Sequence, residues 1–270
     1  MRPLFLRVVC VLSVFIVSLP VYAQSLYAQS IQTALARTTP NLEILLVDLR
    51  THETLANTFA YPETPIPVGS LLKPFLAMAY ARTHSDHFPT VVCHGHPDLC
   101  WKEGGHGPMT LPNAIAQSCN AYFLALARDL DPAMIPYLPA PPPNSSPETL
   151  IGLTSDWSIS PSTLAQAYAA LLTSPPSQTQ KEIIAGMRGS ASNGTASHIG
   201  PHRGGVLAKT GTAPCIDLPC KASGDGLVIA AFPAGRPTLL LLVRKRATTG
   251  AMTASAAGRI LTQLEAMHAE

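Results

Sequence analysis

Charged residues are scarce in this chain. Asp, Glu, Lys and Arg make up 13% of its 270 residues, and the formal net charge is only +2. Neither a block of like charges nor a basic stripe is present, so the sequence argues against nucleic acid as a partner. Hydrophobic residues make up 47%. That is enough for a sizeable core in one domain or in two closely packed subdomains.

A long hydrophobic run is also lacking. The N-terminal run VVCVLSVFIVSL (8–19) is shorter than the ~20 apolar residues that a membrane-spanning helix needs. Two arginines precede it and the small Ala23 follows, which is the pattern of a secretory signal peptide over 1–23. We therefore expect export to the periplasm or cell exterior, a mature domain over 24–270, and no membrane span after cleavage. Cleavage after Ala28 and an uncleaved anchor are the alternatives.

Export implies an oxidising compartment, where disulfides form. Of the six cysteines, Cys10 lies in the signal segment, so five remain after cleavage. This odd number means that at least one thiol is not in an intrachain disulfide. Cys215 and Cys220, in CIDLPC, are expected to close a small disulfide loop. The other three are Cys93, Cys100 and Cys119.

Hydrophobic periodicity predicts an α+β fold. We expect a mainly antiparallel sheet of five strands, flanked by the terminal helices. A helical subdomain over roughly 71–200 would be inserted in it, with a cleft between the two parts. Strands are predicted in a hairpin over 41–59 and at 204–213, 226–234 and 238–246. Helices are predicted at 31–37, 71–83, 113–129, 161–173, 180–188 and 252–268.

Three short motifs point to chemistry. PVGSLLKPF places Ser70 three residues before Lys73, at the start of an apolar helix. Residues i and i+3 share a helix face, so the Lys73 amine can approach the Ser70 hydroxyl, which needs a base to become a nucleophile. QSCNAYF contains Ser118 and Asn120, and AKTGTA contains Lys209. One pair alone is weak evidence, whereas SxxK, SxN and KTG in this order form a specific combination.

These motifs and their contexts resemble the transpeptidase domain of the penicillin-binding proteins, most closely those of class B. The resemblance covers about residues 41–246 and includes GHGPMTLPNAIAQSCNAYF, ISPSTLAQAYAALL and GMRGSASNGTA. It implies the β-lactamase/transpeptidase-like fold. It also implies a serine D,D-peptidase, either transpeptidase or carboxypeptidase, that acts on peptidoglycan stem peptides, needs no cofactor for catalysis, and takes β-lactams as inhibitors.

The resemblance assigns a role to each motif residue. Ser70 would be the acylated nucleophile and Lys73 its general base. Ser118 would relay a proton toward the leaving amine, while Asn120 would hold Lys73 and a substrate amide. The KTGT strand would bind substrate. Its Lys209 and Thr210 would take the terminal carboxylate, Gly211 would allow close approach, and the Thr212 N–H would join that of Ser70 in an oxyanion hole.

Two other functions stay open at this stage. A serine β-lactamase would share the acylation step but would deacylate quickly. The Glu-containing deacylation motif of class A β-lactamases has no counterpart, since the nearest stretch, PETLIG at 147–152, does not match it. A non-catalytic module that senses cell-wall fragments or β-lactams is the third reading, although every catalytic residue type is present.

A second cluster crosses the SxN motif. One stretch contains Cys93, Cys100, His106 and Cys119. In some related class B domains, zinc is held by an aspartate at the position of Cys100, the GHG histidine and the SxN cysteine. The resemblance therefore implies a structural zinc on these four residues. The alternatives are a Cys93–Cys100 disulfide with Cys119 as a buried apolar residue, or neither.

Overall fold

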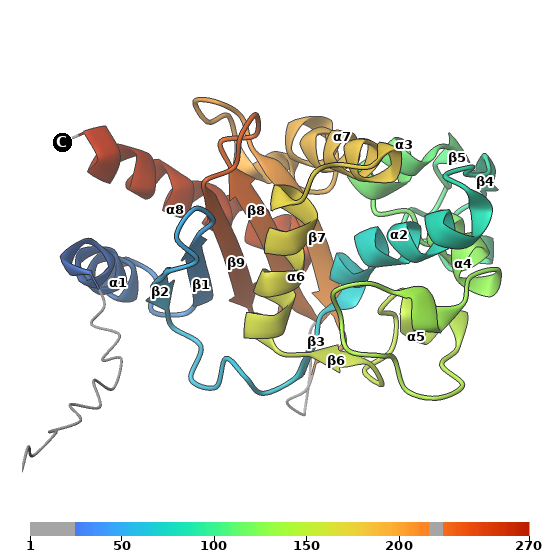
Figure 1. The fold of residues 1–270 in the computed structure, drawn as a ribbon, viewed down its shortest axis with the longest axis horizontal. Helices are drawn as coiled ribbons and strands as arrows, with labels where there is room; N and C mark the ends of the chain where they lie inside the picture. Colours follow the sequence, from blue (N-terminus) through green and yellow to red (C-terminus); the bar gives the residue numbers. More distant parts are fainter. Residues whose placement is uncertain (1–24, 216–223, 270) are drawn as a thin grey trace, which may run out of the picture.

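The computed structural model describes residues 25–215 and 224–269. An antiparallel sheet of five strands runs through it in the order β2-β1-β9-β8-β7 (Figure 1). The predicted α+β fold is thus confirmed. Within the described residues, no helix is long and apolar enough to cross a membrane. The strands are β1 (Glu43–Asp48), β2 (Thr54–Asn57), β7 (Leu207–Ala213), β8 (Asp225–Phe232) and β9 (Leu239–Lys245).

Two sequence predictions fall outside these residues. The signal peptide over 1–23 is one of them. The other is the Cys215–Cys220 disulfide, because Cys220 is not among the described residues. Both stay predictions, as do the boundaries of the helical subdomain.

Strand β9 shows how the sheet is covered on both faces. Its residues 239–243 are all buried, and successive side chains of a strand point to opposite faces. Leu241 and Val243 pack in a core with the terminal helices α1 (Leu26–Thr38) and α8 (Gly250–Ala269), whereas Leu240 and Leu242 pack in the core of the helical part. A strand buried on both faces lacks the apolar–polar alternation of a half-exposed strand.

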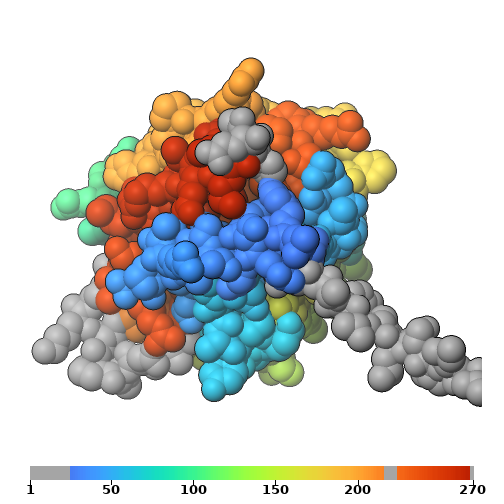
Figure 2. Space-filling model, turned by 90° about the vertical axis from the view of Figure 1, so that its left-hand side faces the viewer, coloured from blue at the N-terminus to red at the C-terminus, as the bar shows by residue number. Residues whose placement is uncertain are grey.

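The terminal helices lie side by side over one face of the sheet. Figure 2 shows α8 next to α1 on that side of the molecule, and Thr38 Oγ1 of α1 donates a hydrogen bond to Gln263 Oε1 of α8 (3.0 Å). Helix α1 begins earlier than the predicted 31–37. Ser25 caps it, because the Ser25 side chain accepts a hydrogen bond from the Ala28 N–H (3.1 Å).

The segment between β2 and β7 forms the helical part. Helix α6 coincides with the predicted 161–173, and Ser160 caps it by accepting from the Thr163 N–H. The single helix predicted over 113–129 is wrong, because the chain breaks it into two. The elements are β3 (Ile66–Pro67), η1 (Gly69–Leu72), α2 (Lys73–His84), β4 (Val91–Cys93), η2 (His96–Asp98), β5 (Gly107–Met109), α3 (Leu111–Ala116), α4 (Asn120–Arg128), η3 (Pro132–Met134), α5 (Pro147–Leu150), β6 (Ser158–Ile159), α6 (Pro161–Thr173), α7 (Gln178–Asn193) and η4 (Ser197–Ile199).

One buried arginine joins three strands of the sheet. Arg244 on β9 is only 4% exposed. Its guanidinium donates to the buried Asp225 of β8 through Nε (3.1 Å) and Nη2, and to Glu43 of β1 through Nη1 (2.9 Å). Removing one member of a buried ion pair leaves an uncompensated charge away from water.

We therefore expect Arg244→Ala to lower the free energy of unfolding by about 3–5 kcal/mol. Arg246→Ala is the matched control, because the Arg246 side chain is 57% exposed and lies 3.7 Å from Glu43. It should cost no more than about 1 kcal/mol. Urea denaturation of both variants measures the difference, and equal effects would contradict the proposed importance of the Arg244–Asp225 pair.

Candidate functional site

A cleft of about 620 Å³ opens where the helical part meets the β7 edge of the sheet. A cavity of this size suits a small molecule or a short peptide. Its lining includes residues from all three motifs: Ser70, Ser118, Asn120, Thr210 and Thr212. Among the described residues, no Asp or Glu lines this cleft.

Ser70 and Lys73 belong to one tight turn. Residues 69–72 form the 3₁₀ helix η1, in which side chains at i and i+3 eclipse, and Lys73 begins α2. Gly69 has a φ of +56°, and a Cβ there would lie 2.5 Å from the Thr212 carbonyl oxygen. Glycine thus allows η1 to lie directly against β7. The Ser70 backbone is thereby held beside the strand that carries Thr212.

Ser118 interrupts the helix that the sequence predicts over 113–129. Its φ is +51°, in the left-handed region, so the chain turns between α3 and α4 instead of continuing. Asn120 is the first residue of α4, and both residues are only 6% exposed. The break presents the Ser118 hydroxyl and the Asn120 amide to the cleft together.

Two fully buried lysines converge on Ser118. Lys209 Nζ donates to Ser118 Oγ (2.8 Å) and to the Thr210 carbonyl (2.7 Å). Lys73 Nζ donates to Asn120 Oδ1 (2.6 Å) and to the Ser118 carbonyl (2.9 Å), and it lies 3.5 Å from Ser118 Oγ. Among the described contacts, no hydrogen bond joins Lys73 Nζ to Ser70 Oγ. The Ser118 hydroxyl is therefore the group shared by both amines.

Burial lowers the pKa of both lysines. The pKa of Lys73 falls to about 8, because loss of water disfavours the ammonium form more than nearby charge at Cys119 and Cys100 favours it. Burial also lowers the pKa of Lys209, and the positive charge of Lys73 lowers it further. A neutral amine is thus accessible near neutral pH, as a general base requires.

The KTGT segment forms the cleft side of β7. Thr210 Oγ1 donates to Thr195 Oγ1 (2.6 Å), and Thr212 Oγ1 accepts from the Gly250 N–H at the start of α8 (3.0 Å). At Gly211 a Cβ would lie 2.6 Å from the Val68 carbonyl oxygen. The strand is therefore fixed on both sides, and Thr195 is a cleft residue that the sequence motifs did not reveal.

Behind the SxN turn lies a cluster of four side chains of the types that ligate metal ions. Cys93 comes from β4, Cys100 follows η2, His106 precedes β5, and Cys119 caps α4. One ligand atom from each lies within 4.8 Å of the other three. The three cysteines are buried free thiols, so the structure contains no Cys93–Cys100 disulfide, and that alternative is not supported.

The spacing of the cluster fits a tetrahedral ion. Zinc bonds of about 2.3 Å to sulfur and 2.0–2.1 Å to nitrogen require about 3.6 Å between S and N and about 3.8 Å between two sulfurs. His106 Nδ1 lies 3.5 Å from both Cys93 Sγ and Cys100 Sγ, and Cys100 Sγ lies 3.9 Å from Cys119 Sγ. The donor set also fits, since three thiolates and one imidazole are typical of a closed structural site.

Hydrogen bonds lower the pKa of the Cys100 thiol. Hydrogen bonding from the Cys119 thiol, together with backbone N–H groups including that of Asn120, lowers the pKa of Cys100 to about 3. The Asn120 N–H lies 3.4 Å from Cys100 Sγ, and Asn120 Nδ2 donates to the Leu99 carbonyl (2.8 Å). The thiol cluster therefore contacts the same asparagine that accepts from Lys73.

Trp101 lies at the rim of the cleft. Its side chain lines the cleft and the residue is 54% exposed. The indole is nonetheless held in place, because Nε1 donates to the Gln117 carbonyl (3.0 Å) and the ring makes an edge contact with His106. Trp157, by contrast, is buried as a packing residue. Exposure at a cleft rim depends on tertiary structure, so no local pattern distinguishes the two tryptophans.

Comparison with solved structures shows that this fold is the one found in the transpeptidase domains of penicillin-binding proteins. No family model matches the chain, and no curated protein sequence matches it. The transpeptidase domain of Burkholderia pseudomallei penicillin-binding protein 3 superposes with a TM-score of 0.66 at 17% identity, over 89% of this chain and 93% of that one.

Two further structures show the same likeness. Pseudomonas aeruginosa PBP2, solved in complex with WCK 5153, gives a TM-score of 0.69 at 17% identity, over 88% of this chain and 76% of that one. Helicobacter pylori PBP2, solved in complex with MreC, gives 0.72 at 14% identity, over 89% of this chain and 62% of that one. The predicted resemblance is thus confirmed at the level of the fold.

The close contact between η1 and β7 can be tested by substituting Gly69. Gly69→Ala would place a Cβ against the Thr212 carbonyl and hold alanine at positive φ, a strain of about 1–3 kcal/mol. We expect a lower melting temperature. Gly104→Ala is the control, because no heavy atom lies within 4 Å of the position that its Cβ would take. A Gly69→Ala variant that melts with the parent would contradict the close contact.

Proposed function

We propose that this protein is an exported active-site-serine D,D-peptidase, a transpeptidase or carboxypeptidase that acts on peptidoglycan stem peptides and is acylated by β-lactams at Ser70. The observation that carries the proposal is the Ser118 hydroxyl, which lies 2.8 Å from Lys209 Nζ and 3.5 Å from Lys73 Nζ in the cleft that Ser70 lines. The shared fold and the order of the three motifs support it.

In the proposed acylation, the Ser70 oxygen attacks the carbonyl carbon of a D-Ala–D-Ala amide. Its proton passes to the neutral Lys73 amine, directly or through Ser118. The backbone N–H groups of Ser70 and Thr212 stabilise the oxyanion. The C–N bond then breaks, and the leaving nitrogen takes the proton back through Ser118. The products are an ester on Ser70 and free D-alanine.

The acyl group next passes to water or to the amine of a neighbouring stem peptide. Rapid hydrolysis, as in a β-lactamase, requires a base that activates water on the acyl-enzyme. No carboxylate lines the cleft among the described residues. This supports a slowly deacylating D,D-peptidase over a β-lactamase, and the intact set of catalytic groups supports an enzyme over a sensing module.

Fluorescent penicillin tests the proposal. The parent should be labelled on the peptide that contains Ser70, and the label should persist for much longer than one β-lactamase turnover. Ser70→Ala should abolish labelling, whereas Ser197→Ala, which changes another serine of the same cleft, should retain it. Labelling that survives in Ser70→Ala would overturn the assignment, and rapid nitrocefin hydrolysis would favour the β-lactamase.

We also propose that Cys93, Cys100, His106 and Cys119 hold a structural zinc ion. With four protein ligands the ion has no open position, so it would supply rigidity rather than a reactive group. Cys119 lies between Ser118 and Asn120, and Cys100 contacts the Asn120 N–H. The ligands would thereby fix the turn that presents both polar side chains to the cleft, and they would protect three thiols in an oxidising compartment.

Elemental analysis of protein purified without chelator should give about one zinc per chain. Cys119→Ser should lower the zinc content, the melting temperature and the rate of penicillin acylation. His94→Ala is the matched control, because His94 lies in the same loop, pairs with Asp98 and is not part of the cluster. A parent protein that contains no metal yet keeps its stability and acylation rate in a strong chelator would exclude the zinc site.

A further inference from the structure

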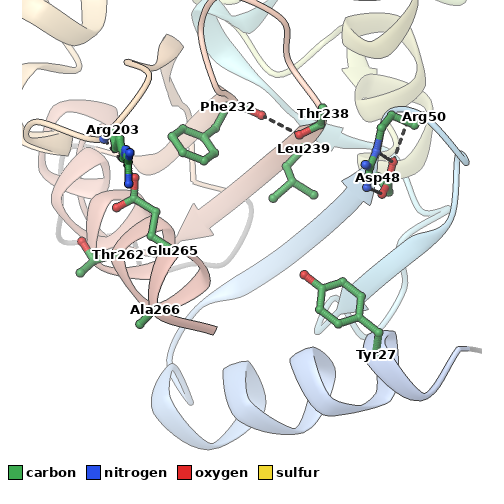
Figure 3. A pocket seen from close by; sticks show the side chains of 10 residues that line it. All are labelled: Tyr27, Asp48, Arg50, Arg203, Phe232, Thr238, Leu239, Thr262, Glu265 and Ala266. Atoms are coloured by element: carbon green, nitrogen blue, oxygen red, sulfur yellow. Dashed lines mark hydrogen bonds and ion pairs between the residues drawn. The ribbon is translucent and has the colours of Figure 1, made fainter. Parts of the chain in front are cut away.

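A second cavity, of about 720 Å³, opens between the two terminal helices. Figure 3 shows Tyr27 of α1 on one side, Thr262 and Glu265 of α8 on another, and the ends of β1 and β9 between them. Its apolar surface includes Phe232, Leu239 and the ring of Tyr27. We refer to it as the terminal-helix pocket. The size is within the range of pockets that bind small organic ligands.

Both carboxylates of the pocket are already engaged. The Asp48 carboxylate accepts from the Arg50 side chain, through Nε (3.2 Å) and Nη2 (2.7 Å), and from the Arg50 backbone N–H (2.7 Å). The Glu265 carboxylate accepts from the Arg203 backbone N–H (3.1 Å) and contacts His202 Nδ1 (3.1 Å). These acids therefore have little remaining capacity to bind a cationic ligand.

The threonine hydroxyls of the pocket already form hydrogen bonds within the protein. Thr238 Oγ1 donates to the Phe232 carbonyl (3.5 Å), and Thr262 Oγ1 donates to the Gly258 carbonyl within α8 (3.1 Å). The Arg203 guanidinium, in contrast, forms no ion pair with any described residue. An arginine beside an apolar surface offers a planar set of donors that matches a carboxylate.

We propose that the terminal-helix pocket binds a small amphipathic organic anion, namely a carboxylate carried on an aryl or alkyl body. The carboxylate pairs with the Arg203 guanidinium. The apolar body packs on Phe232 and Leu239 and against the ring of Tyr27. The Arg203 guanidinium selects the anionic head, and the apolar surface selects a ligand with a hydrophobic body over an inorganic anion.

This pocket is separate from the catalytic cleft. Helix α8 lines the cleft with Ala251 and the pocket with Thr262, and eleven residues of helix correspond to about 16 Å. None of the pocket's lining residues lines the cleft. The inference is therefore independent of the proposed peptidase activity, and a ligand bound here leaves Ser70 accessible.

The fluorescent probe 8-anilinonaphthalene-1-sulfonate tests the pocket, because it combines an aromatic body with one anionic group. Its uncharged analogue, N-phenyl-1-naphthylamine, has the same body. Arg203→Gln should weaken binding of the anionic probe by about tenfold, as expected for loss of one charge-assisted contact, and should leave the uncharged probe unaffected. Arg259→Gln, which changes an exposed arginine of α8 outside the pocket, should change neither.

Two further arms complete the experiment. Thr262→Trp fills the pocket from α8 and should block both probes, and 3-phenylpropionate but not 3-phenylpropanol should displace the anionic probe from the parent. Equal binding of the anionic probe by the parent and Arg203→Gln would overturn the proposal. So would loss of binding after acylation of Ser70 by benzylpenicillin, because that result would place the probe in the cleft.

Discussion

Two lysine side chains lie fully buried around one serine hydroxyl, and much of the neighbouring structure compensates for their removal from water. A buried amine is strongly destabilising unless its donors find partners. Lys209 is satisfied by Ser118 Oγ and the Thr210 carbonyl, and Lys73 by the Asn120 amide and the Ser118 carbonyl. Ser118 must therefore present its hydroxyl to both lysines and its carbonyl to Lys73. The left-handed turn at this residue, between α3 and α4, makes that possible.

The same turn is supported from behind by the thiol cluster. Asn120 is the link, because its side chain accepts from Lys73 while its backbone N–H points to the Cys100 sulfur. Its amide nitrogen donates to the Leu99 carbonyl. The amide is thus oriented by hydrogen bonds on both of its ends, and the oxygen is left facing the amine. A displacement of the Cys100 loop would consequently move the Asn120 amide and disturb its hydrogen bond with Lys73.

The sequence predicts most of the sheet and several helices, because their signals are local. The leucine run of β9 and the Ser160 cap before Pro161 are examples. The break at Ser118 carries no such signal, since QSCN contains neither glycine nor proline and the apolar pattern continues across it. The turn instead follows from contacts with distant elements, namely the two lysines that bond Ser118 and the Cys100 loop behind it.

Some features of the candidate site could likewise be predicted from the sequence, whereas others depend on the folded structure. Motif order identifies Ser70, Lys73, Ser118, Asn120 and Lys209, because the residue types and their sequence appear in the chain itself. The state of the thiols depends on where β4, the loop after η2 and the start of α4 meet, and the spacing of Cys93 and Cys100 alone is compatible with a disulfide or a metal site. The contribution of Thr195, and the exposure of Trp101, likewise require the assembled cleft.

The central sheet separates the candidate catalytic cleft from the terminal-helix pocket. Its alternating side chains divide the interior into two cores, one with the helical part and one with the terminal helices. The buried lysines and the thiol cluster lie on the first side, whereas the terminal-helix pocket is built on the second. Substitutions at distant sites that share no partners tend to act additively. Changes at the terminal-helix pocket, unlike changes at the start of α8 beside Thr212, should therefore leave the hydrogen bonds of Ser118 to Lys73 and Lys209 intact.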